Sequence, residues 1–224
     1  MSLELARIRT RTDYVDEVYR VLLDAISDGT LAPGTRLTQE EIAEQLAVSR
    51  SPVLQALRLL KKDGLVRDAP GRGVLVAPLD VQWIGQLYEV RGALDALAAR
   101  LAARRGARID PQLIEAGRRA SRGNDVRAMI DADIAFHHAV YEACGNPLIG
   151  QSAQTHWVHL RRVMGAVLQS SRLRDAIWDE HEQIAQAIAD GDAERAGAQV
   201  ERHTERARAN LLQRLGEVLR ERSA

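Results

Sequence analysis

The sequence predicts a mainly α protein in which an N-terminal winged helix-turn-helix precedes a C-terminal six-helix antiparallel bundle. Apolar residues recur at helical spacing along most of the 224 residues, and strand-like runs are confined to a short stretch before residue 78. Aromatic residues make up only 4% of the chain, whereas hydrophobic residues account for 46%, enough for an aliphatic core in each part. We therefore expect two domains, residues 1–78 and 79–224.

Three helical segments open the first domain. An amphipathic segment covers residues 15–26. Thr38 and Glu41 have the spacing of a capping box and begin a second helix. A third helix follows Ser49, with Pro52 in its first turn, where a missing N–H does little harm.

Two strand-like runs, residues 65–67 and 74–76, complete the first domain. The loop between them contains Pro70, Gly71 and Gly73, which favour a hairpin. Three helices followed by a hairpin are typical of a winged helix-turn-helix.

Helical patterns fill the rest of the chain. Start signals such as Asp110-Pro111 and stop signals such as Gly106 and Gly145 mark the helix ends. Short connections favour antiparallel neighbours, as in a bundle. The expected helices cover residues 80–105, 111–121, 125–144, 147–170, 174–190 and 192–221.

Charge and cysteine content limit the class of protein. With 31 basic and 31 acidic residues the formal net charge is zero, so a surface for nucleic acid must be local. The single cysteine, Cys144, excludes an internal disulfide and fits a cytoplasmic protein. No run approaches about 20 apolar residues and no apolar signal segment opens the chain, so no membrane span is expected.

The third helix carries the residues expected to read DNA. From Ser49 to Lys62 the chain has four basic residues and no acidic one. Arg50 suits a bidentate guanine contact in the major groove, and the wing tip around Arg72 suits the minor groove. The alternative is a winged helix that contacts protein. The predicted DNA contacts are Arg36, Ser49, Arg50, Ser51, Gln55, Gly71 and Arg72.

Residues 29–43 (GTLAPGTRLTQEEIA), 48–53 (VSRSPV) and 63–66 (DGLV) resemble the head of GntR-family bacterial transcription regulators. The resemblance covers about residues 12–78 and implies binding to an operator in double-stranded DNA. One position departs from it: the family usually carries Arg where this chain has Leu54. We therefore expect an altered operator, with more of the reading done by Gln55.

One Asp and three His are each set in an apolar helical stripe of the second domain. Asp133 and His137 are four residues apart, so they share a face, and His181 and His203 belong to two further helices. Burying such groups unpaired costs about 1–3 kcal/mol each, whereas one divalent cation would satisfy all four. This donor set suits Zn²⁺ first, and also Ni²⁺, Mn²⁺ or Fe²⁺. The alternative is three unrelated core histidines, each bonded to a neighbour.

Residues 133–137 (DIAFH), 146–147 (NP), 181–192 (HEQIAQAIADGD) and His203 resemble the FCD ligand-binding domain of the FadR subgroup, over about residues 80–222. In that family the matching Asp and three His bind a metal, and all four are present here. The expected effector contacts are Arg91, His156 and Arg162. Arg91 has a second candidate partner in Asp95, four residues further on.

These observations predict a homodimeric transcription regulator that is not an enzyme, and the resemblance implies that it is a repressor. It would bind an inverted repeat, and a small carboxylic acid at the metal site would control its affinity for DNA. The alternatives are a metal-dependent helical-bundle hydrolase and a regulator whose metal is purely structural or is itself the signal.

Overall fold

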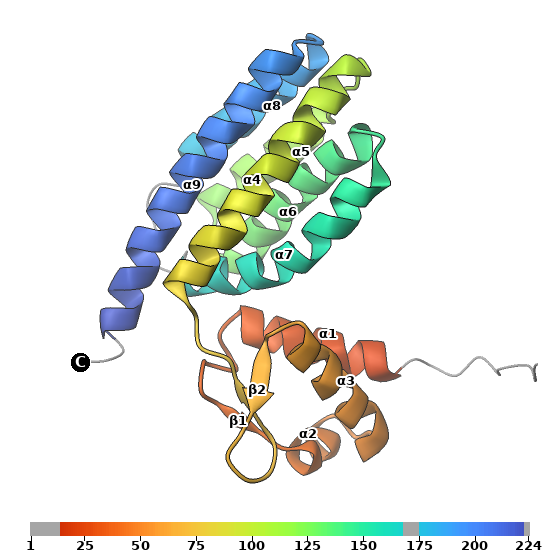
Figure 1. The fold of residues 1–224 in the computed structure, drawn as a ribbon, viewed down its shortest axis with the longest axis vertical. Helices are drawn as coiled ribbons and strands as arrows, with labels where there is room; N and C mark the ends of the chain where they lie inside the picture. Colours follow the sequence, from red (N-terminus) through yellow and green to blue (C-terminus); the bar gives the residue numbers. More distant parts are fainter. Residues whose placement is uncertain (1–13, 168–174, 222–224) are drawn as a thin grey trace, which may run out of the picture. The chain divides into compact units, whose positions relative to one another are not determined.

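The computed structural model of the chain describes residues 14–167 and 175–221. Contacts between these residues define two compact units (Figure 1). The first holds residues 14–26 and 31–77, and the second holds residues 27–30, 78–167 and 175–221. The first unit ends at residue 77, one residue before the domain boundary at residue 78 that the sequence predicted.

The first unit is built from three helices and a small antiparallel sheet. Its strands are ordered β1-β3-β2, and β1 pairs Arg36 with Leu75 and Leu37 with Val74. The sequence predicted only the β2–β3 hairpin, because a two-residue strand is too short to show alternation. The elements are α1 (Tyr14–Ser27), β1 (Arg36–Leu37), α2 (Gln39–Gln45), α3 (Arg50–Lys62), β2 (Val66–Asp68) and β3 (Val74–Val76).

A sharp turn connects α2 to α3. Ala47 adopts a φ of 52°, a left-handed conformation that non-glycine residues rarely adopt. Thr38 caps α2 by accepting a hydrogen bond from the backbone N–H of Glu41, as the capping-box spacing predicted. The apolar face of α3, including Val53 and Leu60, is buried, so its opposite face is left to solvent.

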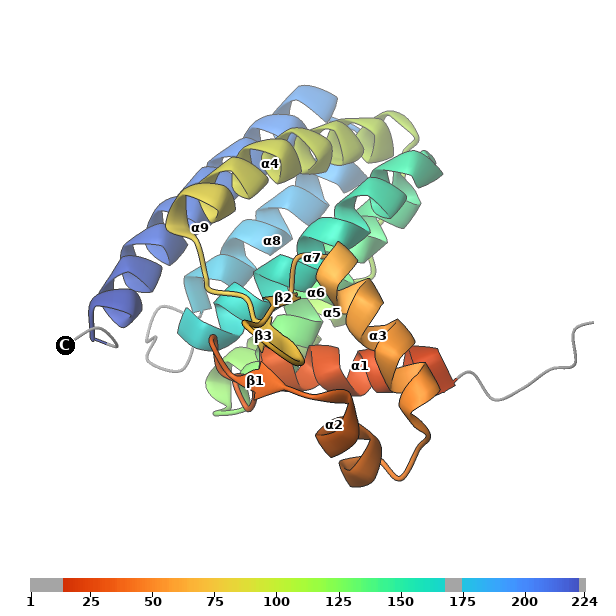
Figure 2. The same cartoon turned by 60° about the horizontal axis from the view of Figure 1, so that its bottom comes forward.

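The second unit is a helical bundle, as the sequence predicted. In Figures 1 and 2, α4 and α9 run side by side, and α6 packs against α4, α5 and α7. Residues 168–170 and 174, which were expected to be helical, lie outside the described residues. Within the described part, no helix is long and apolar enough to cross a membrane. The helices are α4 (Val81–Arg104), α5 (Pro111–Arg122), α6 (Val126–Ala143), α7 (Pro147–Val167), α8 (Asp175–Ala189) and α9 (Ala193–Glu221).

Helix α5 approaches α8 closely at Gly117, where the indole of Trp178 packs against it. A Cβ at Gly117 would lie 1.9 Å from the indole of Trp178, so glycine is required there. Trp178 in turn lies edge-on to His181, with ring centroids 4.7 Å apart. Phe136 stacks on the same imidazole at 4.2 Å. Two aromatic side chains thus pack against the buried His181 ring.

Candidate functional site

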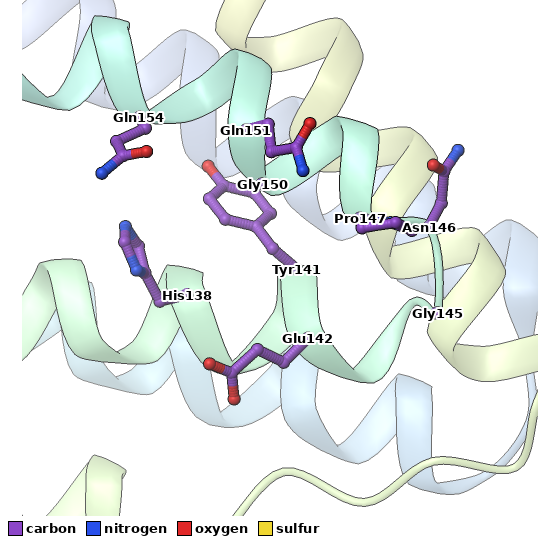
Figure 3. Close-up of a pocket in the computed structure, with 9 residues that line it drawn as sticks. All are labelled: His138, Tyr141, Glu142, Gly145, Asn146, Pro147, Gly150, Gln151 and Gln154. Atoms are coloured by element: carbon purple, nitrogen blue, oxygen red, sulfur yellow. The ribbon is translucent and has the colours of Figure 1, made fainter. Parts of the chain in front are cut away.

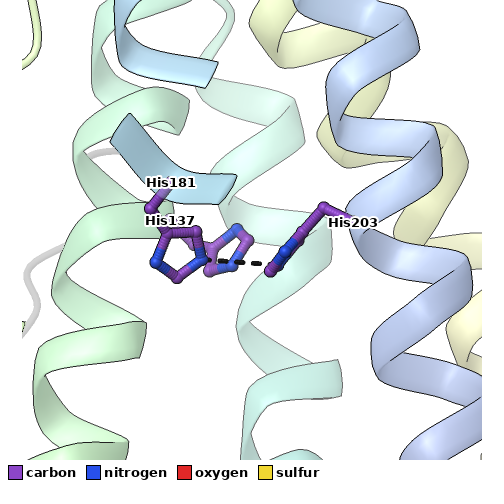
Figure 4. A group of neighbouring side chains, drawn as sticks. All are labelled: His137, His181 and His203. Carbon is purple, nitrogen blue, oxygen red and sulfur yellow. Dashed lines mark hydrogen bonds between the residues drawn. The ribbon is translucent and has the colours of Figure 1, made fainter. Parts of the chain in front are cut away.

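Histidines from three helices meet in the interior of the second unit. His137 lies on α6, His181 on α8 and His203 on α9, and all three are buried. One ring nitrogen from each lies within 4.8 Å of those of the other two. Figure 4 shows the three side chains reaching toward a common point. Three inward positions that are far apart in the sequence thus form one cluster.

Two distances in this cluster, from His181 to His203 and to Asp133, fit those between ligands of a tetrahedral cation. Nε2 of His181 lies 3.3 Å from Nε2 of His203 and 3.5 Å from Oδ1 of Asp133. Zinc binds imidazole nitrogen at about 2.0–2.1 Å, which separates two ligand atoms of a tetrahedron by about 3.3 Å. The same distance also fits one N–H···N hydrogen bond between neutral rings, which is the metal-free interpretation of this pair.

Burial favours the neutral form of the His137 and His181 imidazoles. It is the main cause that lowers the pKa of His137 and of His181 well below the ordinary value, with further lowering by Arg91 and the neighbouring histidines. Neutral imidazole is the form that binds a metal. Burial also raises the pKa of Asp133, and a bound cation would lower it.

Glu180 supports the cluster from behind. Its Oε2 lies 2.8 Å from Nδ1 of His203, so that ring donates its Nδ1 proton to the carboxylate and turns Nε2 toward the other histidines. Arg206 donates to the second carboxylate oxygen at 2.8 Å. Burial alone would raise the pKa of Glu180, but these two hydrogen bonds outweigh it and the pKa is lowered. A carboxylate behind a metal-binding histidine fixes its tautomer and raises its basicity.

Glu180 precedes His181 on α8 and does not share its inward face, so helical spacing alone gives no reason to place Glu180 beside the cluster. Its partner instead comes from α9, and no spacing along the chain signals this contact. By contrast, Nδ1 of His181 is buried and has no hydrogen-bond partner within the described residues. The polar contacts of the His181 ring are therefore all on its Nε2 side.

A buried polar network joins α4 to α6 beside the cluster. Arg91 donates from Nε to Asp95 at 3.1 Å, and Asp95 also accepts from the Tyr141 hydroxyl. The Trp157 ring lies 4.1 Å from the guanidinium carbon. Arg91 thus has the intrahelical partner that was one of its two candidates. Its Nη2 also lies 2.9 Å from Nε2 of His137, so a cation and Arg91 compete for that nitrogen.

A cavity of about 330 Å³ opens beside the cluster. Arg91, Asp133, Glu180 and His203 all line it, and it continues along α9 toward Arg214. This volume suits a small ligand. Two predicted effector contacts lie elsewhere: the buried Arg162 and the partly buried His156 are not among its lining residues.

A second hollow, of about 540 Å³, lies between α6 and α7 (Figure 3). His138, Gln151 and Gln154 give it a polar lining. Tyr141 also lines it, and that hydroxyl belongs to the Arg91–Asp95 network.

The N-terminal turn of α3 presents the polar residues predicted to read DNA. Ser49, Arg50, Ser51 and Gln55 are all exposed. Ser49 is the N-cap residue, but its side chain makes no cap hydrogen bond. Arg50 pairs with Glu40 at 3.1 Å, and both side chains are more than half exposed. Such a pair is weak and yields readily to a better partner.

Arg36 secures the loop between β2 and β3. It donates to the carbonyl oxygens of Pro70 and Arg72, at 2.9 and 2.7 Å. Gly71 at the tip has a φ of 86°, which suits glycine. Arg72 is exposed there. The sequence predicted a phosphate contact for Arg36 and gave no sign of this bracing role.

The comparisons with known proteins agree with this architecture. Residues 14–76 match the gntR family of bacterial regulatory proteins, and residues 86–206 match the FCD domain. The probable D-xylose utilization operon transcriptional repressor of Paenarthrobacter nicotinovorans is 28% identical over 190 residues, which are 84% of each chain.

Two solved structures share the fold. E. coli McbR/YncC has a TM-score of 0.77 at 22% identity, over 91% of this chain and 99% of the other. A GntR transcriptional regulator from Rhodococcus sp. RHA1 has a TM-score of 0.75 at 27% identity, over 90% and 99%.

Fold and site thus define a two-part bacterial transcription regulator that binds DNA, and not an enzyme. The chain belongs to the GntR family, in the group whose C-terminal part is an FCD domain.

Proposed function

We propose that this protein is a homodimeric repressor whose affinity for its operator is controlled by a small carboxylic acid bound beside a metal ion. The observation that carries the proposal is the histidine cluster at one end of a cavity that Arg91 also lines. Asp133, His137, His181 and His203 would hold the ion, which supplies a positive charge and an open coordination position for a carboxylate oxygen.

Arg91 couples the cavity to the helices in this proposal. A carboxylate in the cavity accepts hydrogen bonds from Arg91, which then loosens its contact with His137. Because Arg91 lies on α4 and His137 on α6, filling the cavity changes how these helices are tied together. Control of DNA binding follows only if the acid binds the operator-competent arrangement and the other arrangement with different affinity.

The DNA contacts in the proposal are those predicted from the sequence. Arg50, Ser49, Ser51 and Gln55 are exposed at the start of α3, where a recognition helix contacts base edges. A dimer presents two such helices, so its operator is an inverted repeat. The related D-xylose operon protein is itself named as a repressor, which supports the direction of control.

Binding measurements on a selected operator test the proposal. Selection from random DNA duplexes with the purified protein supplies the operator. The affinity of the protein for this operator is then measured in the presence of hydroxy acids, sugar acids and dicarboxylic acids. Each measurement is made with zinc-loaded and with chelator-treated protein. We expect one class of acid to weaken binding tenfold or more (about 1.4 kcal/mol), and only in the zinc-loaded protein.

Matched variants locate the effect. Arg91→Lys should abolish the response to the acid while operator binding persists, since a lysine does not reproduce a guanidinium fork. Arg161→Lys is the control, because Arg161 pairs with Asp131 and does not line the cavity. A response to zinc without any acid would make the metal the signal. If operator affinity responds neither to zinc nor to the acid, the ion has a purely structural role.

A further inference from the structure

The cavity beside the histidine cluster has a second cationic end. Its lining positions on α9 follow one face of that helix and include His203, Ala207, Leu211 and Arg214. His203 belongs to the cluster, and Arg214 is the last residue of α9 that lines the cavity. Because an α-helix rises about 1.5 Å per residue, these two positions lie about 16 Å apart along the helix axis. The cavity is therefore elongated, with the cluster at one end and Arg214 at the other.

Arg214 is the cation of this cavity that has no partner. Arg91 donates to Asp95 at 3.1 Å, and Arg206 donates to Glu180 at 2.8 Å. Within the described part of the chain, the Arg214 side chain makes no ion pair and no hydrogen bond, and it is only partly exposed. Arginine side chains on a helix extend back toward its N-terminus, which for Arg214 is the direction of the cluster. Its guanidinium is thus available to an anion in the cavity.

Apolar side chains line the cavity along its length. They come from α7, α8 and α9 and include Met164, Ile177, Ala207 and Leu211. An alkyl chain that lies against them gains roughly fourfold in affinity for each CH₂ group that it buries. A ligand that reaches from one end of the cavity to the other therefore needs an apolar middle.

We infer that the cavity binds an α,ω-dicarboxylic acid with an unbranched apolar middle. One carboxylate lies beside Arg91 and the histidine cluster, and the other accepts hydrogen bonds from Arg214. The inference rests on the proposed function, in which a carboxylic acid occupies this cavity, and it names the class of acid. An acid as small as acetate or lactate would fill only the cluster end of a cavity of about 330 Å³ and would leave Arg214 without a partner.

The charges near Arg214 favour a carboxylate over a phosphate group as the second anion. A phosphate group carries up to two negative charges and binds most strongly where several cations meet. Arg206, the neighbouring cation on the same helix, is already held by Glu180, whose own charge repels an anion. A single free guanidinium matches a single carboxylate, which it binds through two parallel hydrogen bonds.

Calorimetric titration of the zinc-loaded protein with matched acids tests the inference without DNA. The diacids adipate, suberate and sebacate are compared with the monoacids hexanoate, octanoate and decanoate, which have the same chain lengths and lack the second carboxylate. The diacid that binds most tightly should bind at least tenfold more tightly than its matched monoacid, because a hydrogen-bonded charge pair is added. Succinate is too short to reach Arg214 and should bind at least tenfold more weakly than that diacid.

Variants of Arg214 assign this preference to one side chain. Arg214→Gln should remove the advantage of the diacid and change the affinity for the monoacid less than twofold. Arg214→Glu should reverse the preference, so that the ω-amino acid of the same length binds more tightly than the diacid. Arg202→Gln is the matched control, since Arg202 is exposed on the same helix and does not line the cavity. Circular dichroism shows that each variant is folded.

The outcomes separate this inference from the proposed function. Diacid and monoacid that bind the wild type equally, or a diacid advantage that survives both Arg214 variants, would overturn the inference. An operator response to some other acid would then leave the proposed function standing. If the diacid binds through Arg214 and operator affinity does not change, the inference holds and the proposed control of DNA binding fails.

Discussion

Replacing Glu180 should weaken the binding of a metal ion at the histidine cluster without removing any ligand. Glu180 contacts His203 through a 2.8 Å hydrogen bond to Nδ1, on the far side of the ring from the cluster. The carboxylate holds the ring in the tautomer whose Nε2 lone pair faces the other histidines, and its charge makes that nitrogen more basic. Partners of this kind are worth about 10–100-fold in metal affinity.

Glu180→Gln and Glu180→Ala should give the two ends of this range of metal affinity, because they remove different parts of the contact with His203. Gln at position 180 can still accept the Nδ1 proton but loses the negative charge, so we expect a loss of about tenfold, or roughly 1.4 kcal/mol. Ala removes the acceptor as well, and we expect about 100-fold, or roughly 2.7 kcal/mol. Both changes leave Arg206 without its carboxylate partner, which adds a repulsive charge near the ion.

Competition with a chromophoric zinc chelator at fixed pH measures these affinities. Glu182 supplies the control, because it lies two residues further along α8 and pairs with Arg118 instead. Glu182→Gln and Glu182→Ala should change zinc affinity less than twofold. The reasoning fails if Glu180→Ala binds zinc as tightly as the wild type, or if the Glu182 variants lose as much.

Three further predictions concern other parts of the molecule. Arg50→Ala should abolish specific operator binding and leave the melting temperature unchanged; equal affinity at matched salt would reject Arg50 as a base contact. Leu54→Arg should strengthen DNA binding and make it more dependent on salt, because it adds a cation at a partly exposed position of α3; a binding selection that shows no gain and no altered preference would refute this. Tyr141→Phe removes a buried hydrogen bond to the Asp95 carboxylate, worth about 1.5–3 kcal/mol. It should lower the melting temperature of the metal-free protein by roughly 3–12 °C, and a drop below about 1 °C would contradict the network.

The fold was accessible from the sequence because most of its signals are local. Asp80, Asp110 and Asp125 cap their helices with side-chain oxygens, and the positive φ of Gly106 and Gly145 follows helix ends. Each of these signals lies within a few residues of the boundary that it sets. The strand β1 was missed because its two residues acquire their conformation from pairing with β3, a partner almost forty residues away.

The candidate site was accessible only in part, for the same physical reason. Inward stripes identify His137, His181 and His203 because burial is a property of one helix at a time. Contacts between helices leave no such trace, so neither the hydrogen bond of Glu180 to His203 nor the contact of Arg91 with His137 could be inferred. Arg162 illustrates the converse: it is buried, but on a part of α7 that does not line the cavity.

The central claim is that Asp133 and the three histidines hold one cation, and metal content tests it most directly. The purified protein is loaded with zinc, desalted and measured by elemental analysis against chain concentration. The account predicts one zinc per chain for the wild type and none for the variant carrying His181→Ala and His203→Ala, whose circular dichroism should remain helical. A wild type that retains no zinc, or a double variant that retains as much as the wild type, would contradict it.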